Sequence, residues 1–306
     1  MSKRNEEKAT LERAAAEGNT SAMNSLGFLA AGEGDLAGAR TWWEQAAATG
    51  HPGAMYNLGI VAEGEGDVVG ARDWYERAAA GGDSGAMYNL GNLADREGDL
   101  AGARAWWEQA AATGHSGAMN NLGVLAKGEG DTAGARTWYE RAAAAGESGA
   151  MFNLGVLADR EGDVAGARTW WERAAAAGDS GAMYNLGVFA EGEGDLAGAR
   201  TWWERAAAVG NTGAMKNLGV FAEGEGDVVG ARDWYERAAE EGNTEAGTEL
   251  KRLLTIPAAT GLGQKNPVDP DSVQTSAKAR FCEQCGATRS TDARFCGECG
   301  REFPHS

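Results

Sequence analysis

A 32-residue period runs through most of this 306-residue chain and constrains its fold more than any other feature. A Leu-Gly pair opens the period each time, and a Gly-Asp pair follows it within the same unit. The glycines of the seven Leu-Gly pairs are Gly27, Gly59, Gly91, Gly123, Gly155, Gly187 and Gly219. A partial unit precedes this array (Leu11 to Gly18) and another follows it (Asn243 to Leu254). Such a period predicts stacked units that bury a continuous core, with half-repeats as caps at both ends.

Each repeat predicts two helices joined by a short Gly-Glu-Gly-Asp turn. In the second helix of the first repeat, Ala39, Trp42, Trp43, Ala46 and Ala47 follow helical spacing and form one apolar stripe. The aspartate of the turn stands where a helix N-cap belongs, and the glycine before it suits a positive backbone φ. The other helix carries its own apolar side, which includes the Leu-Gly pair. The fold class is therefore all-α, an α-solenoid of seven helix-turn-helix repeats.

Eleven tryptophans lie mostly in pairs on the second helices. Both members of each pair occupy the apolar stripe, so we predict that they are core side chains that fill volume left by small neighbours. A stacking platform for single-stranded nucleic acid would need basic neighbours, but residues 1–255 contain 22 Lys and Arg against 39 Asp and Glu. Glycines inside these helices (Gly38, Gly70, Gly102 and their equivalents) cost helix stability, and we expect close helix approach to compensate.

The array resembles tetratricopeptide and Sel1-like repeats over residues 9–254. One unit shows the pattern: Ala54-Met55, Leu58-Gly59, Gly66-Asp67, Ala71, Trp74-Tyr75 and Ala78-Ala79. Two features depart from tetratricopeptide repeats, because the period is shorter than theirs and alanine replaces the tyrosine usual after Leu-Gly. The resemblance implies a right-handed α-solenoid that binds other proteins through its concave face.

In related arrays the first helix lines the concave surface, and its asparagine before Leu-Gly can bond a peptide backbone. On this face the repeats differ from one another. Together these positions predict a groove with an apolar floor, amide donors and an acidic edge, suited to an apolar segment with nearby Lys or Arg. The alternative is that the same side chains pack between neighbouring repeats. The predicted groove residues are Tyr56, Asn57, Ile60, Tyr88, Asn89, Asn92, Asn120, Asn121, Val124, Phe152, Asn153, Val156, Asp159, Tyr184, Asn185, Val188 and Glu191.

Composition excludes several other roles. The net charge of −17 disfavours nucleic acid and anionic membranes as partners. No apolar run approaches the ~20 residues that span a bilayer, so we expect no membrane insertion, and the charged N-terminus, with no secretory signal, indicates a cytoplasmic protein. No catalytic constellation is present: the glutamates that recur in every repeat are scaffold residues, and the histidines lack a partner pattern. We therefore predict that the protein is not an enzyme.

The C-terminal part predicts a different module. Residues 255–279 carry three of the five prolines and no apolar periodicity, which is typical of a flexible linker. Two Phe-Cys-x-x-Cys-Gly knuckles follow at residues 280–303 and predict a small zinc ribbon with short β structure and one structural zinc. Iron or a redox dithiol are the alternatives. The expected zinc ligands are Cys282, Cys285, Cys296 and Cys299.

The sequence thus predicts five segments: a disordered N-terminus (1–8), the solenoid (9–254, with caps at 9–20 and 243–254), the linker, the ribbon and a tail (304–306). The predicted function is that of an adaptor, in which the solenoid groove binds a peptide or protein segment and the ribbon makes a second contact. The alternative is a regulator in which the ribbon contacts DNA or RNA and the solenoid recruits partners. Salt-dependent binding to nucleic acid distinguishes the two.

Overall fold

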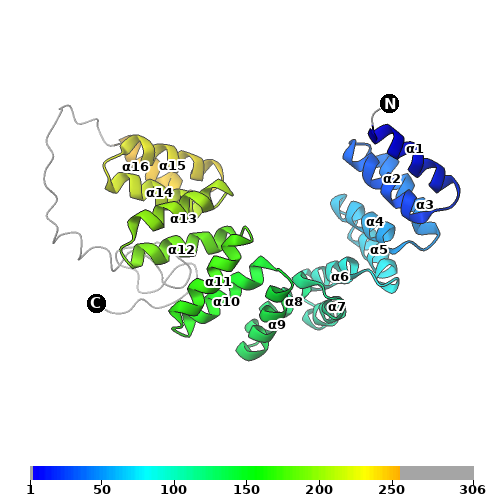
Figure 1. Cartoon of the computed structure of the whole chain (residues 1–306), viewed down its shortest axis with the longest axis horizontal. Coiled ribbons are helices and arrows are strands. Elements are labelled where there is room, and N and C mark those ends of the chain that lie inside the picture. Colours follow the sequence, from blue (N-terminus) through cyan, green and yellow to red (C-terminus); the bar gives the residue numbers. More distant parts are fainter. Residues whose placement is uncertain (1–2, 256–306) are drawn as a thin grey trace. The chain divides into compact units, whose positions relative to one another are not determined.

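A computed structural model describes residues 3–255, which form sixteen α-helices and no strand (Figure 1). The helices are α1 (Lys3–Ala16), α2 (Thr20–Gly32), α3 (Leu36–Ala48), α4 (Pro52–Gly64), α5 (Val68–Ala80), α6 (Ser84–Arg96), α7 (Leu100–Ala112), α8 (Ser116–Gly128), α9 (Thr132–Ala144), α10 (Ser148–Arg160), α11 (Val164–Ala176), α12 (Ser180–Gly192), α13 (Leu196–Ala208), α14 (Thr212–Gly224), α15 (Val228–Glu240) and α16 (Thr244–Thr255). The prediction of an all-helical solenoid is confirmed for these residues. The predicted linker, zinc ribbon and tail lie outside them.

The chain divides into two compact units, one ending at Gly162 and the other beginning at Asp163. Inside the first unit, helices pack as consecutive antiparallel hairpins (α2 with α3, α4 with α5, α6 with α7, α8 with α9), and each second helix also packs on the first helix of the next hairpin. The second unit repeats this arrangement with α12 to α15 and ends on α16. This order follows from the repeat, since each helix buries its apolar stripe against its sequence neighbours on both sides.

The N-terminal cap is longer than predicted. Helix α1 begins at Lys3, so residues 3–8, expected to be disordered, belong to a helix. Leu11 and Ala14 of α1 pack against Ala22 and Leu26 of α2, and Ala15 is buried with them. This contact holds the C-terminal half of α1 against α2, and the helix continues from there toward the N-terminus.

The turn between the helices of each repeat has the predicted capping. In the first repeat Asp35 caps α3, and its Oδ1 accepts a hydrogen bond of 2.8 Å from the backbone N–H of Gly38. Gly34 has a φ of +82°, and the N–H of Asp35 donates back to the carbonyl of Ala30, which closes the end of α2. An L-residue with a side chain would be strained at Gly34.

Gly38 has a different role from the one we expected. It does not allow close approach of helices: an added Cβ would collide with the carboxylate of Asp35, lying 2.8 Å from its Cγ. The glycine therefore leaves room for the side chain that caps the helix. The same relation holds between Gly70 and Asp67, and between Gly102 and Asp99. The propensity cost of the glycine is offset by the N-cap hydrogen bond.

Close approach occurs instead at the Leu-Gly pairs. At six of these glycines the second aromatic residue of the following helix lies directly on the glycine. A Cβ added at Gly123 would stand 2.5 Å from Cε1 of Tyr139, and Trp43 and Tyr75 lie in the same way on Gly27 and Gly59. These second aromatic residues are buried in every repeat. They are the core of each hairpin, as predicted.

The first aromatic residue of each pair is a tryptophan and is only partly buried, which corrects our prediction for seven of the eleven tryptophans. In five repeats an arginine three residues further along the helix covers its outer face, as Arg141 does for Trp138, with its Cζ 4.3 Å from the ring centroid. At this position the helical stripe reaches the edge of the hairpin, so the ring packs inward on one face and meets a guanidinium on the other.

Candidate partner-binding surface

The predicted groove residues lie on the first helices of the repeats, in α4, α6, α8 and α10 of the first unit and α12 of the second. Two apolar members are openly exposed although they stand in mid-helix: Ile60 at 45% and Val124 at 51%. Tyr56, Tyr88 and Phe152 are half-buried. This combination is typical of a surface that is shaped by its neighbours but still accessible to another molecule.

Several asparagines before Leu-Gly form hydrogen bonds between repeats. The side-chain amide of Asn57 donates to Oδ1 of Asn24, and that of Asn153 donates to Oδ1 of Asn120, each at 3.1 Å. Asn57 is also buried. The resemblance assigned these amides to a partner's backbone, whereas here at least one donor of each joins neighbouring first helices. For these residues the alternative of packing between repeats describes the geometry better.

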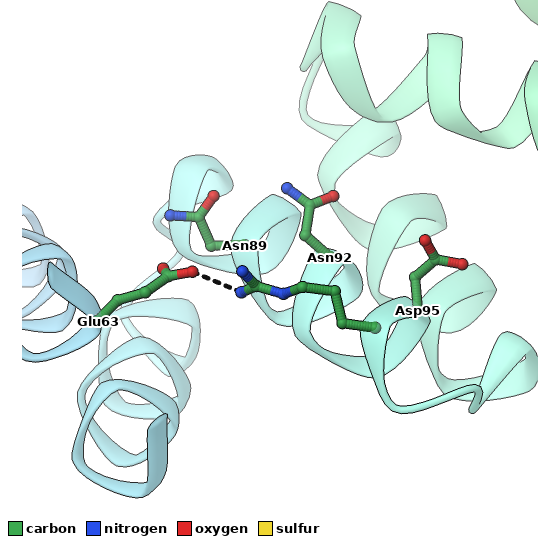
Figure 2. Close-up of a pocket in the computed structure, with 5 residues that line it drawn as sticks. Glu63, Asn89, Asn92 and Asp95 are labelled. Carbon is green, nitrogen blue, oxygen red and sulfur yellow. Dashed lines mark hydrogen bonds and ion pairs between the residues drawn. The ribbon is translucent and has the colours of Figure 1, made fainter. Parts of the chain in front are cut away.

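Asn92 is a polar residue at the position that Ile60 and Val124 occupy in the neighbouring repeats. Its side-chain carbonyl forms hydrogen bonds within the protein. Its Oδ1 accepts hydrogen bonds from Nε1 of Trp107 at 3.2 Å and from Nδ2 of Asn121 at 3.1 Å. A polar pocket of about 200 Å³ lies beside it (Figure 2). The pocket is lined by Glu63, Asn89, Asn92, Asp95 and Arg96.

Glu63 is the central charge of this pocket. Its carboxylate accepts a hydrogen bond of 2.9 Å from the hydroxyl of Tyr75 and pairs with Arg96 at 2.5 Å. A dashed line at the labelled Glu63 marks this ion pair in Figure 2. Burial would raise the pKa of the Glu63 carboxyl, but the bonds from Arg96 and Tyr75 outweigh it and lower this pKa below its ordinary value. At this position the acidic edge is therefore neutralised within the protein.

In the second unit the same face is formed by α12 and α14. Tyr184, Asn185 and Val188 are half-buried, and burial raises the pKa of the Glu191 carboxyl. Lys216 is buried and its ammonium pairs with Glu245 of α16 at 2.5 Å. The charged residues of this face therefore differ in their surroundings, because Glu191 is partly desolvated whereas Lys216 forms an ion pair with Glu245.

Four of the predicted apolar and aromatic groove residues lie on either side of the division between the units. Phe152 and Val156 belong to α10 in the first unit, and Tyr184 and Val188 to α12 in the second, all four half-buried. Within the first unit, Asp159 follows one turn after Val156 on the same helix.

A ladder of arginine–glutamate pairs was not predicted from the sequence. The arginine near the start of a second helix pairs with the glutamate of the next repeat's turn, as Arg72 does with Glu97 at 2.7 Å. Arg104 with Glu129 and Arg136 with Glu161 repeat it. The helical pattern predicts only that these arginines face outward. The constant spacing between Gly-Ala-Arg and the next Glu-Gly-Asp is the sequence signal from which the ion pairs could have been predicted.

The remaining predictions concern metal and membrane. Within residues 3–255 no group of three or more His, Cys, Asp or Glu is placed to hold a metal ion. The four cysteines expected to bind zinc lie outside this range. None of the helices that the structure describes is long and apolar enough to cross a bilayer.

Comparison with known families agrees with the geometry. Two models described as tetratricopeptide repeat match the chain, one at residues 26–86 and 120–182 and the other at 84–109 and 180–205. A model described as Sel1 repeat matches residues 213–243. Comparison with curated proteins finds no significant match.

Similar solved structures are repeat proteins. A Sel1 repeat protein from Oxalobacter formigenes is 28% identical, with a TM-score of 0.64 over 80% of this chain and 79% of that one. The protective antigen c5321 of uropathogenic Escherichia coli strains, described as displaying an SLR fold, is 29% identical with a TM-score of 0.59. That match covers 79% of this chain but only 58% of the antigen. Yeast Tom70, 12% identical with a TM-score of 0.57 over 88% of this chain and 61% of its own, shares the fold.

Proposed function

This chain is a tetratricopeptide and Sel1-like repeat protein, a type of protein-interaction scaffold, and we propose that it acts as an adaptor that binds a segment of another protein on its first helices. The observation that carries the proposal is the exposure of Ile60 and Val124 in the middle of α4 and α8, on the face where the repeats differ most. Exposed aliphatic side chains on the first helices, bordered by amides and carboxylates, favour a protein ligand.

The proposed partner segment is apolar with nearby Lys or Arg. Its aliphatic side chains would cover Ile60 and Val124. A basic side chain would be attracted to the acidic edge of the same unit, where Asp95 lines the polar pocket. The amide groups have less to offer than the sequence suggested, because several already bond between repeats.

The binding surface is tested with two substitutions and a matched control. Ile60→Glu with Val124→Glu introduces charge on the proposed surface, whereas Val69→Glu does so on a second helix at a side chain that is 82% exposed. Partners captured by the wild-type chain should be lost with the double variant and retained with Val69→Glu, while all three proteins keep the same helical circular dichroism. Equal capture by the double variant would remove this surface from consideration. Unfolding of the double variant would show that it is core.

We further propose that residues 280–303 form a zinc ribbon that makes a second contact in the cytoplasm. The proposal rests on the doubled Phe-Cys-x-x-Cys-Gly pattern, in which four thiolates complete a closed tetrahedral site for one structural zinc. Metal analysis should give one zinc per chain, lost on Cys285→Ser, with the melting of the helical array unchanged. Stoichiometric zinc in the Cys285→Ser protein would refute the assignment, and salt-dependent DNA or RNA binding would favour a nucleic-acid regulator over an adaptor.

A further inference from the structure

Six of the seven repeats begin their second helix with an exposed aliphatic residue, directly after the aspartate that caps the helix. Capping does not need an aliphatic side chain here, because the aspartate accepts the capping hydrogen bond. Leu36, for example, keeps 64% of its surface exposed. We call these residues the edge row: Leu36, Val68 and Leu100 in the first unit, and Val164, Leu196 and Val228 in the second.

The next position along each second helix is exposed as well. It is alanine in five repeats and valine in two, Val69 and Val229. Among the large hydrophobic side chains of residues 3–255, these two valines are the most exposed, at 82% and 72%. A single exposed aliphatic residue needs no explanation, but an exposed position that is aliphatic in six of seven repeats indicates an interaction surface.

The edge row lies on the side of each unit where the hairpin turns are. Each of its members follows the turn between the two helices of a hairpin, and the hairpins pack in chain order. An ion pair links consecutive members: Arg72, one turn after Val68, pairs with Glu97 at 2.7 Å. Glu97 in turn stands three residues before Leu100. Aliphatic residues and ion pairs therefore alternate with the same period in both units.

The surroundings of the edge row carry little unmatched charge. Each turn glutamate forms an ion pair with a basic residue of the preceding unit, as Arg104 does with Glu129 and Arg168 with Glu193, both at 2.5 Å. Each turn aspartate caps a second helix. Two copies can therefore approach along this side with less repulsion than the net charge of −17 on each would suggest.

The sizes of the side chains in the two units are complementary. The edge row reads Leu, Val, Leu in the first unit and Val, Leu, Val in the second. When the row of the first unit faces the row of the second unit in another copy, every leucine meets a valine. In the antiparallel direction the facing pairs are Leu36 with Val228, Val68 with Leu196, and Leu100 with Val164.

The position after the edge row follows the same rule. In the antiparallel arrangement Val69 faces Ala197 of the other copy, and Val229 faces Ala37. A large side chain then stands opposite a small one at both positions, which keeps packing even along the contact. The sizes would also match in the parallel direction, but only the antiparallel one allows a two-fold axis to form the contact twice and close a dimer.

We propose that the edge row is a self-association surface, on which the first unit of one copy packs antiparallel against the second unit of another. The occupant of this surface is thus a second copy of the chain. The proposal does not depend on partner binding at the first helices, which lies on a different face of the repeats. Because aliphatic contacts alternate with exposed ion pairs, we expect a weak dimer with a dissociation constant of about 1–100 µM.

Sedimentation of the full chain between about 1 and 200 µM tests the proposal, since this range spans the expected constant. The mass should rise from 31.8 kDa toward twice that value. Leu100→Glu and Val164→Glu should each weaken the dimer about tenfold or more, because each buries a carboxylate against an aliphatic residue. Glutamate is favoured in the first turn of a helix, so helical circular dichroism should stay unchanged. A monomer throughout, or an undiminished dimer in both variants, would overturn the proposal.

Exchanging the side-chain sizes tests the pairing itself. One chain carries only valine in the edge row (Leu36→Val, Leu100→Val and Leu196→Val), and the other carries only leucine (Val68→Leu, Val164→Leu and Val228→Leu). Each should dimerise more weakly with itself than the wild type does, through underpacking or overpacking. A mixture restores a leucine opposite each valine, and the mixed dimer should be about threefold or more tighter than either homodimer. A mixed dimer no tighter than the leucine homodimer would refute the pairing.

Val69→Glu separates this proposal from the adaptor function. It places a charge beside the edge row, so it should weaken the dimer while capture of the adaptor's partner is retained. Ile60→Glu with Val124→Glu should do the reverse, losing the partner and keeping the dimer. If that double variant abolished the dimer and Val69→Glu left it unchanged, self-association would belong to the first helices and the edge-row proposal would be wrong.

Discussion

Replacing the glycine of a Leu-Gly pair by alanine should destabilise the protein, although alanine is the better helix former. In α4 the Gly59→Ala methyl would lie 2.5 Å from Cδ1 of Tyr75, about 1 Å inside normal contact. Tyr75 has no exposed surface, and its hydroxyl is held by Glu63 at 2.9 Å, so the ring cannot move away freely. The collision therefore has to be absorbed by the packing of the α4–α5 hairpin.

The magnitude follows from three contributions. Overpacking of a core typically costs about 1–3 kcal/mol. Breaking the Tyr75–Glu63 bond costs about 1.5–3 kcal/mol more if the ring is displaced. Alanine returns about 1 kcal/mol through helix propensity and a less flexible unfolded chain. Because the ring is displaced only in part, we expect a net loss of about 1–4 kcal/mol.

The assay is urea unfolding followed by circular dichroism, with two comparison variants in the same chain. Gly64→Ala changes a glycine of the same helix whose added methyl meets nothing within 4 Å, so it should be neutral or stabilising by up to about 1 kcal/mol. Gly123→Ala collides with Tyr139, whose hydroxyl has no bond to lose among the described residues, and should cost less than Gly59→Ala. If Gly59→Ala were as stable as Gly64→Ala, the aromatic ring would not be seated on the helix.

Three further outcomes are expected. Trp107→Ala, in the core, should cost about 3–5 kcal/mol, and the half-buried Trp106→Ala clearly less; equal urea midpoints would contradict this difference. Arg72→Ala should change the free energy of unfolding by less than about 1 kcal/mol, because its ion pair with Glu97 is solvent-exposed. A larger loss of stability that shrinks as salt is added would show that these ion pairs contribute more than we expect. The Tyr139 phenol should ionise with a pKa of about 12, measured by absorbance. Because its pKa is higher in the folded than in the unfolded protein, the neutral phenol stabilises the fold fully below pH ~10, and this contribution is lost toward pH 12. Ionisation near pH ~10 in the folded protein would contradict its burial.

The sequence by itself determined the architecture. The constant repeat period, the apolar stripes and the Gly-Asp turns predicted the helices of the array, because helical spacing and capping are local properties of the chain. Aspartate before a glycine-containing first turn was enough to locate the start of each second helix. The second aromatic residue was correctly predicted as core for the same reason.

Only the tertiary structure decided how each side chain is used within that architecture. Trp42 and Trp43 share one stripe in the sequence, but the distance of each from the neighbouring helices makes the second core and the first a rim residue. Asn57 could bond a ligand or its neighbour Asn24, and the spacing between adjacent repeats selects the neighbour.

The same holds for charge. Glu63 and Lys127 occupy equivalent positions in the sequence. Only the packed repeats bring Tyr75 and Arg96 to the first, and the positive charge of Arg160 near the second. Periodicity reports which face a residue occupies, but its partners in the following helix and in the next repeat depend on how neighbouring hairpins stack. The opposite charges at Glu63 and the like charges at Lys127 are therefore evident only from the tertiary structure.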